Sequence, residues 1–327
     1  MKLDRRQWMA VALAAGAMGT LDSAWAQTYP ERTITIVVSY PPGGDSDALA
    51  RLFAEKLSQR VKQSVMVENR AGASGTVGNT AVLRSKPDGY TLLFTPNTFP
   101  TAPILLKLDA AASYDPVNGF DPVILTGMQS LMLVAHVDTG IKTIKDLVDK
   151  AKSGKALTYA SPGAGSPMHI AAEMLNRAAD IKITHVPYRG TGPMIPDLIA
   201  GRVDMGYSTL GPVTQHIASG KLVTVAVTDG EQSPLIPGVK TVAEQGYPSV
   251  KEGAWNGIMA PKGTPRPIID MLNAHMNEIL KMPDVIQRMG TFGARPVGGA
   301  PEILSKTNAD DYARLTKAIA DLKITAD

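Results

Sequence analysis

The stretch Ser161-Pro-Gly-Ala-Gly-Ser166, followed by Pro167-Met-His169, decides how this chain is read. It lies between an extended run at 156–160 and a helical run at 170–178. Ser166 is typical of a helix N-cap, and Pro167 fits the first helical position, where its missing N–H costs nothing. The small residues before the cap let backbone N–H groups approach a bound group, and a helix N-terminus adds about half a positive charge. The stretch predicts an anion site, above all for a carboxylate, with an ordinary strand-to-helix turn as the alternative.

The first 26 residues predict a cleaved export signal. Lys2, Arg5 and Arg6 precede an apolar run over 8–18, and Ala24-Trp-Ala26 places small residues at the cleavage positions. Residues 5–9 (Arg-Arg-Gln-Trp-Met) also resemble a twin-arginine signal, so the general-secretion and twin-arginine routes both stay open. No later stretch reaches 18 apolar residues. We expect an exported, soluble protein in the periplasm.

The composition argues against several classes of protein. Cysteine is absent, which excludes a disulfide framework, a thiol nucleophile and a lipid-anchoring cysteine. Removing residues 1–26 leaves a net charge of +2, and no basic run with interleaved aromatic residues is present. That pattern argues against a nucleic-acid partner.

Apolar runs and helical spacings alternate along the chain. Alternation of this kind indicates parallel βαβ units, whose ligands bind beyond the carboxyl ends of the strands. The expected strands are 33–38, 65–67, 91–95, 131–137, 157–160, 183–186, 203–207, 222–227 and 255–260. The expected helices are 48–61, 76–83, 144–151, 167–178, 194–200, 239–246, 265–280, 283–292 and 301–319.

A second glycine-rich loop, Tyr40-Pro-Pro-Gly-Gly-Asp-Ser46, follows the first expected strand. Asp45 or Ser46 is the expected cap of the next helix. Gly43-Gly44 fits either ligand contact or plain turn geometry. Asn97 and Thr98 follow another strand end.

Two charged residues stand near strands of the second half of the chain. Arg189 is suited to a two-pronged contact with a carboxylate, although its residue type alone favours a salt-bridged or solvent-facing arginine. Asp204 is a candidate partner for a loop or a ligand hydroxyl, and strand-end solvation is its alternative.

Catalytic patterns are sparse. The five histidines are widely spaced, and His169 with Glu173 lacks the third ligand that a metal site needs. No G-x-S-x-G motif is present. Gly163-Ala-Gly165 begins like a dinucleotide fingerprint, but Met168 occupies the third glycine position. We therefore expect a protein that is not an enzyme, with no catalytic residue, metal or cofactor.

A single loop is too weak to hold a small anion. Micromolar affinity needs about 8 kcal/mol, whereas a helix terminus contributes about 0.3–2 and a charge-assisted hydrogen bond about 1.5–3. Two lobes that each present a glycine-rich helix N-terminus supply several donors and exclude water when they close. The two loops over 40–46 and 161–166 provide that pair.

Segments in a fixed order along nearly the whole chain resemble the periplasmic solute receptors of tripartite tricarboxylate transporters, the Bug family. They include Glu68-Asn-Arg-Ala-Gly72, Pro87-Asp-Gly-Tyr-Thr91, His185-Val-Pro-Tyr-Arg-Gly190 and Gly263-Thr-Pro265, together with the two glycine loops. The chain departs from the family pattern at Thr158-Tyr159-Ala160, where asparagine, tyrosine and glycine are usual, and at Arg189, where lysine is usual.

The resemblance implies an α/β fold of two lobes, a periplasmic binding protein of type II (Venus flytrap), with the ligand cleft between the lobes. We expect lobe I over 27–124 and 229–327, and lobe II over 125–228. The site that the resemblance implies comprises Tyr40, Pro41, Pro42, Gly43, Gly44, Asp45, Ser46, Ser161, Pro162, Gly163, Ala164, Gly165, Ser166 and His169. We expect the Ser161 and Ser166 hydroxyls to hold one carboxylate. We expect the other end of the ligand to be sensed by Asn97, Thr98, Arg189 or Asp204.

The implied function is capture of a small carboxylate for inner-membrane permease subunits. A C4–C6 di- or tricarboxylate and an aromatic dicarboxylate such as terephthalate both fit, and the receptor is expected to be a monomer. Two alternatives are a ligand-sensing partner of a membrane sensor kinase and an exported α/β hydrolase.

Overall fold

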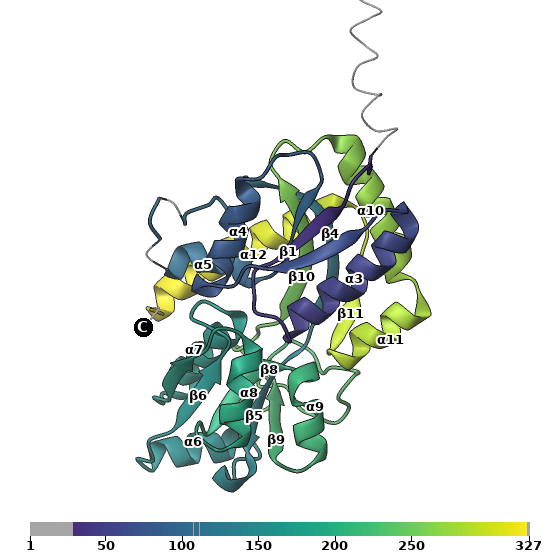
Figure 1. The fold of residues 1–327 in the computed structure, drawn as a ribbon. Helices are drawn as coiled ribbons and strands as arrows, with labels where there is room; N and C mark the ends of the chain where they lie inside the picture. The colour runs from purple at the N-terminus through teal and green to yellow at the C-terminus, as the bar shows by residue number, and fades with distance from the viewer. Residues whose placement is uncertain (1–28, 107, 111, 326–327) are drawn as a thin grey trace, which may run out of the picture.

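The computed structural model describes residues 29–325 except 107 and 111. These residues form two α/β lobes, one above the other in Figure 1, each built on its own β-sheet. The expected export signal at 1–26 lies outside the described residues. Within the described part, the helices are all too short or too polar to cross a bilayer.

Lobe I contains a six-stranded mixed sheet in the order β11-β4-β10-β3-β1-β2. Its strands are β1 (Ile34–Val38), β2 (Val65–Asn69), β3 (Thr91–Pro96), β4 (Phe120–Gln129), β10 (Ala254–Pro261) and β11 (Ala294–Pro296). Its helices are α3 (Asp45–Val61), the 3-10 turn η1 (Ala73–Gly75), α4 (Thr76–Leu83), α5 (Thr98–Leu105), α10 (Arg266–Leu280), α11 (Pro283–Thr291) and α12 (Pro301–Leu322). The first three strands are parallel, and β10 runs antiparallel to β3 and β4.

Strand β1 shows why this sheet has helices on both faces. Successive side chains of a strand point to opposite faces. Ile36 packs in the core cluster that contains Phe53 of α3, whereas Val37 packs on the other side with Phe99 of α5. A strand that is buried on both faces must be apolar at nearly every position, as the sequence of β1 is.

Lobe II contains a five-stranded sheet in the order β7-β6-β8-β5-β9. Its strands are β5 (Leu131–His136), β6 (Thr158–Ser161), β7 (Thr184–Pro187), β8 (Met205–Thr209) and β9 (Leu222–Val227). Its helices are the 3-10 turn η2 (Val137–Thr139), α6 (Ile144–Lys152), α7 (Pro167–Ala179), α8 (Thr191–Ile199) and α9 (Leu210–Ala218). Strand β6 is parallel to β7 and β8, and β5 is antiparallel to β8 and β9.

The chain crosses between the lobes at positions that differ from the expected boundaries. Strand β4 stays in the lobe I sheet to Gln129, so the first crossing is at Ser130 rather than at 124–125. The segment 229–253, which we expected in lobe I, packs on lobe II, because Val242 and Val250 lie in the lobe II core. The second crossing therefore comes just before β10.

Several elements differ from the sequence-based expectation. Helices α5 and α9 and strands β4 and β11 were not expected, and residues 239–246 form a bridge and turns instead of a helix. Proline weakens a helix prediction, yet Pro212 lies in the first turn of α9, where no intrahelical N–H is needed. In the turn region, Val242 donates its N–H to the carbonyl of Val227, which keeps this backbone beside β9.

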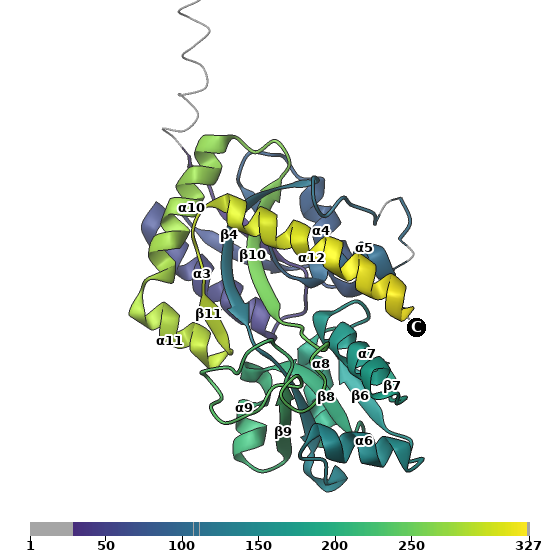
Figure 2. The same ribbon diagram turned by 180° about the vertical axis from the view of Figure 1, so that it is seen from behind.

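The last helix, α12, connects the two lobes. It crosses lobe I and ends near α7 (Figure 2). Leu315 and Ile319 of α12 share a buried cluster with Ile170 of α7. Lobe I therefore contacts lobe II on the side of the cleft that α7 borders.

Candidate ligand-binding site

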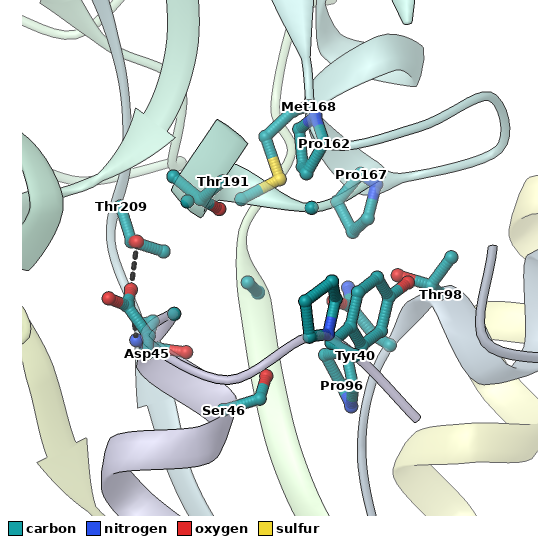
Figure 3. A pocket seen from close by; sticks show the side chains of 17 residues that line it. Tyr40, Asp45, Ser46, Pro96, Thr98, Pro162, Pro167, Met168, Thr191 and Thr209 are labelled. Carbon is teal, nitrogen blue, oxygen red and sulfur yellow. Dashed lines mark hydrogen bonds between the residues drawn. The ribbon is translucent and has the colours of Figure 1, made fainter. Parts of the chain in front are cut away.

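A cavity lies between the lobes, at the carboxyl ends of β1, β3, β6, β7 and β8. Side chains of lobe I, including Tyr40 and Ser46, face Met168 and Thr191 of lobe II across it (Figure 3). We call it the ligand cavity. Its lining residues are Tyr40, Pro41, Gly44, Asp45, Ser46, Pro96, Asn97, Thr98, Gln129, Pro162, Pro167, Met168, Gly190, Thr191, Gly192, Thr209 and Ala254.

The loop that follows β1 positions Asp45 at this cavity. Helix α3 begins at Asp45, and its N-cap is Gly44, not Asp45 or Ser46 as expected. The Asp45 carboxylate turns away from its own helix. It accepts hydrogen bonds from Thr209 Oγ1 in lobe II and from Gln129 Nε2, the latter over 3.3 Å. The side chain of Asp45 thus connects the two lobes at the edge of the cavity (Figure 3).

The loop of lobe II has the capping arrangement that the sequence predicts. Ser166 is the N-cap of α7, and its side chain accepts a hydrogen bond from the N–H of His169 over 3.2 Å, with Pro167 in the first turn. The Ser161 hydroxyl lies 2.6 Å from Nε2 of His185 and accepts the N–H of Gly163. Both serine hydroxyls are buried and are engaged inside the loop rather than exposed in the ligand cavity.

The ring of His169 supports the same loop. Its Nδ1 accepts the N–H of Gly165 over 3.2 Å, and the ring stacks on His185 with 4.2 Å between centroids. The ring of His185 also stacks on Tyr159, at 4.8 Å. His169 therefore fixes the position of the loop from behind.

The lobes touch directly beside the cavity. Ser74 Oγ of lobe I donates to the carbonyl of Ala164 over 2.7 Å, and Thr101 Oγ1 of lobe I donates to the carbonyl of Gly165. A second, outer cavity lies here. Its lining residues are Ser39, Tyr40, Pro41, Gly72, Ala73, Ser74, Gly75, Pro162, Gly163, Ala164, Pro187, Tyr188 and Arg189.

Helix N-termini dominate the electrostatics of the ligand cavity. The first residues or caps of α3, α5, α7, α8 and α9 all line it. The backbone N–H groups of a first helical turn have no intrahelical acceptor and carry partial positive charge. Among the described residues, the lining contains no arginine, lysine or histidine. Such a cavity is suited to an anion held by backbone N–H groups and hydroxyls.

Burial raises the pKa of two ionisable side chains in the lining. Burial raises the pKa of the Asp45 carboxyl to about 6, and hydrogen bonds from Thr209 and Gln129 partly oppose this shift. Burial also raises the pKa of Tyr40 to about 12, so its hydroxyl stays protonated and can donate. Among the described lining residues of the ligand cavity, Asp45 is therefore the one with a charged side chain at neutral pH.

The expected site residues fall into three groups. Those that line the ligand cavity are Tyr40, Pro41, Gly44, Asp45, Ser46, Asn97, Thr98 and Pro162. Those that line only the outer cavity are Gly163, Ala164 and Arg189. Those that line neither cavity are Pro42, Gly43, Ser161, Gly165, Ser166, His169 and Asp204.

Asp204 lies at the opposite end of its strand from the ligand cavity. It precedes β8, and its carboxylate accepts the backbone N–H and the hydroxyl of Thr158 over 2.8 and 2.9 Å. Arg189 is exposed at the outer cavity. Asp204 therefore lies outside both cavities, and Arg189 borders the outer cavity but not the ligand cavity.

The residues that line the ligand cavity but were not expected at the site include Thr191, Gly192, Gln129 and Thr209. The first two follow β7 in a strand–glycine–helix pattern like that of the opening loop, which is a usable signal. Thr209 precedes α9, and the apolar spacing of Leu210, Val213 and Ile217 marks that helix only weakly. Gln129 has no local signal, because it reaches the cavity through the crossing at Ser130.

The fold and the cavity together define a two-lobed solute-binding receptor of the Venus-flytrap type. In the described residues, His, Asp and Glu side chains form no group of three that could hold a metal ion. The polar groups of the lining are helix N-termini, hydroxyls, side-chain amides and one carboxylate, which are suited to binding and orienting a solute.

Comparison with known proteins identifies the family. Residues 49–324 match the model of the tripartite tricarboxylate transporter family receptor. Protein BugT of Bordetella pertussis is 36% identical over 88% of this chain and 89% of its own. The structure of R. palustris Rpa4515 with adipate is 30% identical with a TM-score of 0.86, over 91% of this chain and 99% of that one. MatC from Rhodopseudomonas palustris with bound malate is 31% identical with a TM-score of 0.83, over 89% of this chain and 100% of that one.

The chain belongs to the tripartite tricarboxylate transporter receptor family, whose members include the Bug proteins. Its members are periplasmic solute-binding receptors and not enzymes, which confirms the expected family, fold class and absence of catalysis.

Proposed function

We propose that this protein captures a small carboxylate in the periplasm, closes around it, and delivers it to the membrane subunits of a tripartite tricarboxylate transporter. The observation that carries the proposal is the convergence of five helix N-termini, from both lobes, on one cavity without a basic side chain. An anion is the ligand that such a lining stabilises. Two relatives whose structures contain adipate and malate support the carboxylate class.

The residues proposed to bind are those that line the ligand cavity. Backbone N–H groups of Ser46, Thr98, Met168 and Gly192 lie in first helical turns, and Thr191 adds a hydroxyl. Each contact contributes on the order of 1 kcal/mol, so the ligand needs both lobes at once. Binding stabilises the closed arrangement, which is the state that we propose the permease recognises.

The proposal also includes the export route and the oligomeric state. Residues 1–26 direct the chain to the periplasm by the general-secretion or the twin-arginine route, and the receptor works as a monomer. Replacing Arg5 and Arg6 with lysine distinguishes the routes, because twin-arginine export requires the arginine pair.

A ligand panel on the mature protein tests the proposed function. We expect C4–C6 dicarboxylates, amino carboxylates or aromatic carboxylates to raise the melting temperature, because a ligand that binds only the folded state stabilises it. Isothermal titration then gives the affinities. If no carboxylate stabilises the protein at millimolar concentration, the proposed function is wrong.

A further inference from the structure

Asp45 is an unusual residue for an anion cavity. The residue is 8% exposed, it lines the ligand cavity, and it carries the one charged group among the described lining residues. A buried carboxylate repels a second carboxylate and is costly unless donors or a positive charge compensate it. The feature therefore constrains the chemistry of the ligand.

The protein itself compensates Asp45 only in part. Thr209 and Gln129 both donate to the same oxygen, Oδ2. No hydrogen bond within the described residues ends on Oδ1, and no described lysine or arginine forms a salt bridge with Asp45. A carboxylate accepts about four hydrogen bonds, so Asp45 retains accepting capacity.

Asn97, which also lines the ligand cavity, has a side-chain oxygen without a described partner. Its Nδ2 donates to the carbonyl of Gly253 over 3.0 Å, whereas its Oδ1 is buried and has no hydrogen-bond partner among the described residues. Buried polar atoms of this kind are nearly always satisfied, and those in a binding site are often completed by the ligand. The lining residues thus include donors at the helix N-termini and, in Asp45 and Asn97, side chains with acceptors that no described residue fills.

We propose that the ligand is an amino carboxylate, whose carboxylate lies at the helix N-termini and whose protonated amine donates to Asp45. This inference rests on the proposed function and names its substrate class. An ammonium group carries three N–H donors and one positive charge, which match the unfilled acceptors and the negative charge of Asp45. A dicarboxylate of the same length places a second negative charge beside Asp45.

The ionisation of Asp45 agrees with this assignment. Burial raises its pKa to about 6, so the carboxylate is largely ionised at neutral pH even without a ligand. An ammonium group nearby lowers the pKa further, because an opposite charge favours the ionised form.

Matched ligand pairs test the inference. The mature wild-type protein is titrated calorimetrically at pH 7.5 with β-alanine and succinate, 4-aminobutanoate and glutarate, 5-aminopentanoate and adipate, and 4-(aminomethyl)benzoate and terephthalate. Asp45→Asn removes the charge with little change in size. Asp149→Asn is the matched control, because Asp149 is 61% exposed on α6 and lines neither cavity.

We expect the wild type and Asp149→Asn to prefer the amino member of the best-bound pair by at least about tenfold, the size of one charge-assisted hydrogen bond. In Asp45→Asn that preference falls below about threefold or reverses. Equal or tighter binding of the dicarboxylate by the wild type overturns the inference but leaves the proposed function intact. A preference for the amine that survives in Asp45→Asn also overturns it. If neither member of any pair binds but another carboxylate of the wider panel does, the inference is overturned; if no carboxylate of that panel binds, the proposed function itself fails.

Discussion

Thr101 Oγ1 in lobe I donates a hydrogen bond to the carbonyl oxygen of Gly165 in lobe II over 2.5 Å. Ser74 makes the same kind of contact with the preceding residue, Ala164. Two side chains of one lobe therefore hold two consecutive carbonyls of the other. Because these contacts require the lobes to be close, they contribute to the balance between closed and open forms.

Removing one of these contacts is expected to weaken binding from a distance. Thr101→Val keeps the shape of the side chain but loses the donor, at a cost of about 1 kcal/mol or more, since the Gly165 carbonyl loses its partner. We expect the ligand affinity to fall about fivefold to tenfold and the radius of gyration in small-angle scattering to rise. Thr214→Val is the control, because its hydroxyl donates within α9. Equal effects of the two variants would contradict the prediction.

Gly165 itself is expected to be intolerant of a β-branched side chain. Its φ of +77° is a conformation that glycine adopts readily, and an added Cβ would lie 3.2 Å from Cδ1 of Leu105 across the lobe contact. Gly165 lines neither cavity, so Gly165→Val acts through loop strain and closure. We expect binding to be lost and stability to fall by about 1–3 kcal/mol.

Combining Leu105→Ala with Gly165→Val separates the steric contact with Leu105 from the backbone strain at Gly165. Leu105→Ala removes the steric contact but leaves the backbone strain, so the double variant should recover closure only partly. Full recovery of ligand affinity, measured by titration, would show that strain at Gly165 plays no part.

Gly192 offers a way to fill the ligand cavity without strain. It lies in the first turn of α8 with an ordinary φ, and an added Cβ meets only the carbonyl oxygen of Pro42, at 4.0 Å. In the series Gly192→Ala, Val and Leu we expect affinity to fall stepwise, by more than a hundredfold for leucine. The melting temperature should change little along the series. Wild-type affinity in Gly192→Leu would place the ligand elsewhere.

The second crossing between the lobes is held by an ion pair between a buried acid and a half-exposed arginine. The carboxylate of Glu252 is fully buried and receives two hydrogen bonds from Arg314 of α12, at 2.7 and 3.2 Å. Arg314→Met leaves the acid buried without its counterion and should destabilise the fold by about 3 kcal/mol in urea unfolding. In the double variant with Glu252→Gln, most of that loss should be recovered. A loss below about 0.5 kcal/mol in the single variant would mean that the pair contributes little.

The sequence correctly predicted those helices and strands whose ends depend on neighbouring residues in the chain. The cap at Ser166 with Pro167 behind it was confirmed, and helix α4 and strand β9 have the expected ranges. Helix α5 was missed because Pro100 and Pro103 argue against a helix, yet Phe99 and Ala102 are completely buried and hold it by packing. Tertiary burial outweighed propensity there.

The site was only partly predictable for a different reason. The contact between Asp45 and Thr209 joins residues 164 positions apart on two lobes. Sequence pattern placed Asp45 at a helix start, where capping was the obvious role, and could not show which side chain would face it. Asp204 shows the opposite error, because it lies at the start of the expected strand 203–207, whereas ligands bind beyond the carboxyl ends of such strands.

Asp45 should make the unliganded protein less stable as the pH rises. The folded-state pKa of about 6 lies above the ordinary value of 3.8, so the folded protein holds this proton more tightly than the unfolded chain. Stability therefore falls between about pH 4 and pH 6, by roughly 3 kcal/mol for a shift of about two pKa units. Burial also raises the pKa of Asp229 to about 6, so Asp229 adds a loss of stability over the same pH range.

Asp45→Asn removes the pH dependence of stability that comes from Asp45 and leaves that of Asp229. The groups that face Asp45 are Gln129 and Thr209, neither of which titrates in this range. Melting temperatures from pH 4 to pH 7.5 should show the variant more stable than the wild type at neutral pH, with the two curves converging towards pH 4. A variant less stable at pH 7.5 would mean that the ionised carboxylate is already fully compensated by Thr209 and Gln129. Its negative charge would then place no demand on the ligand.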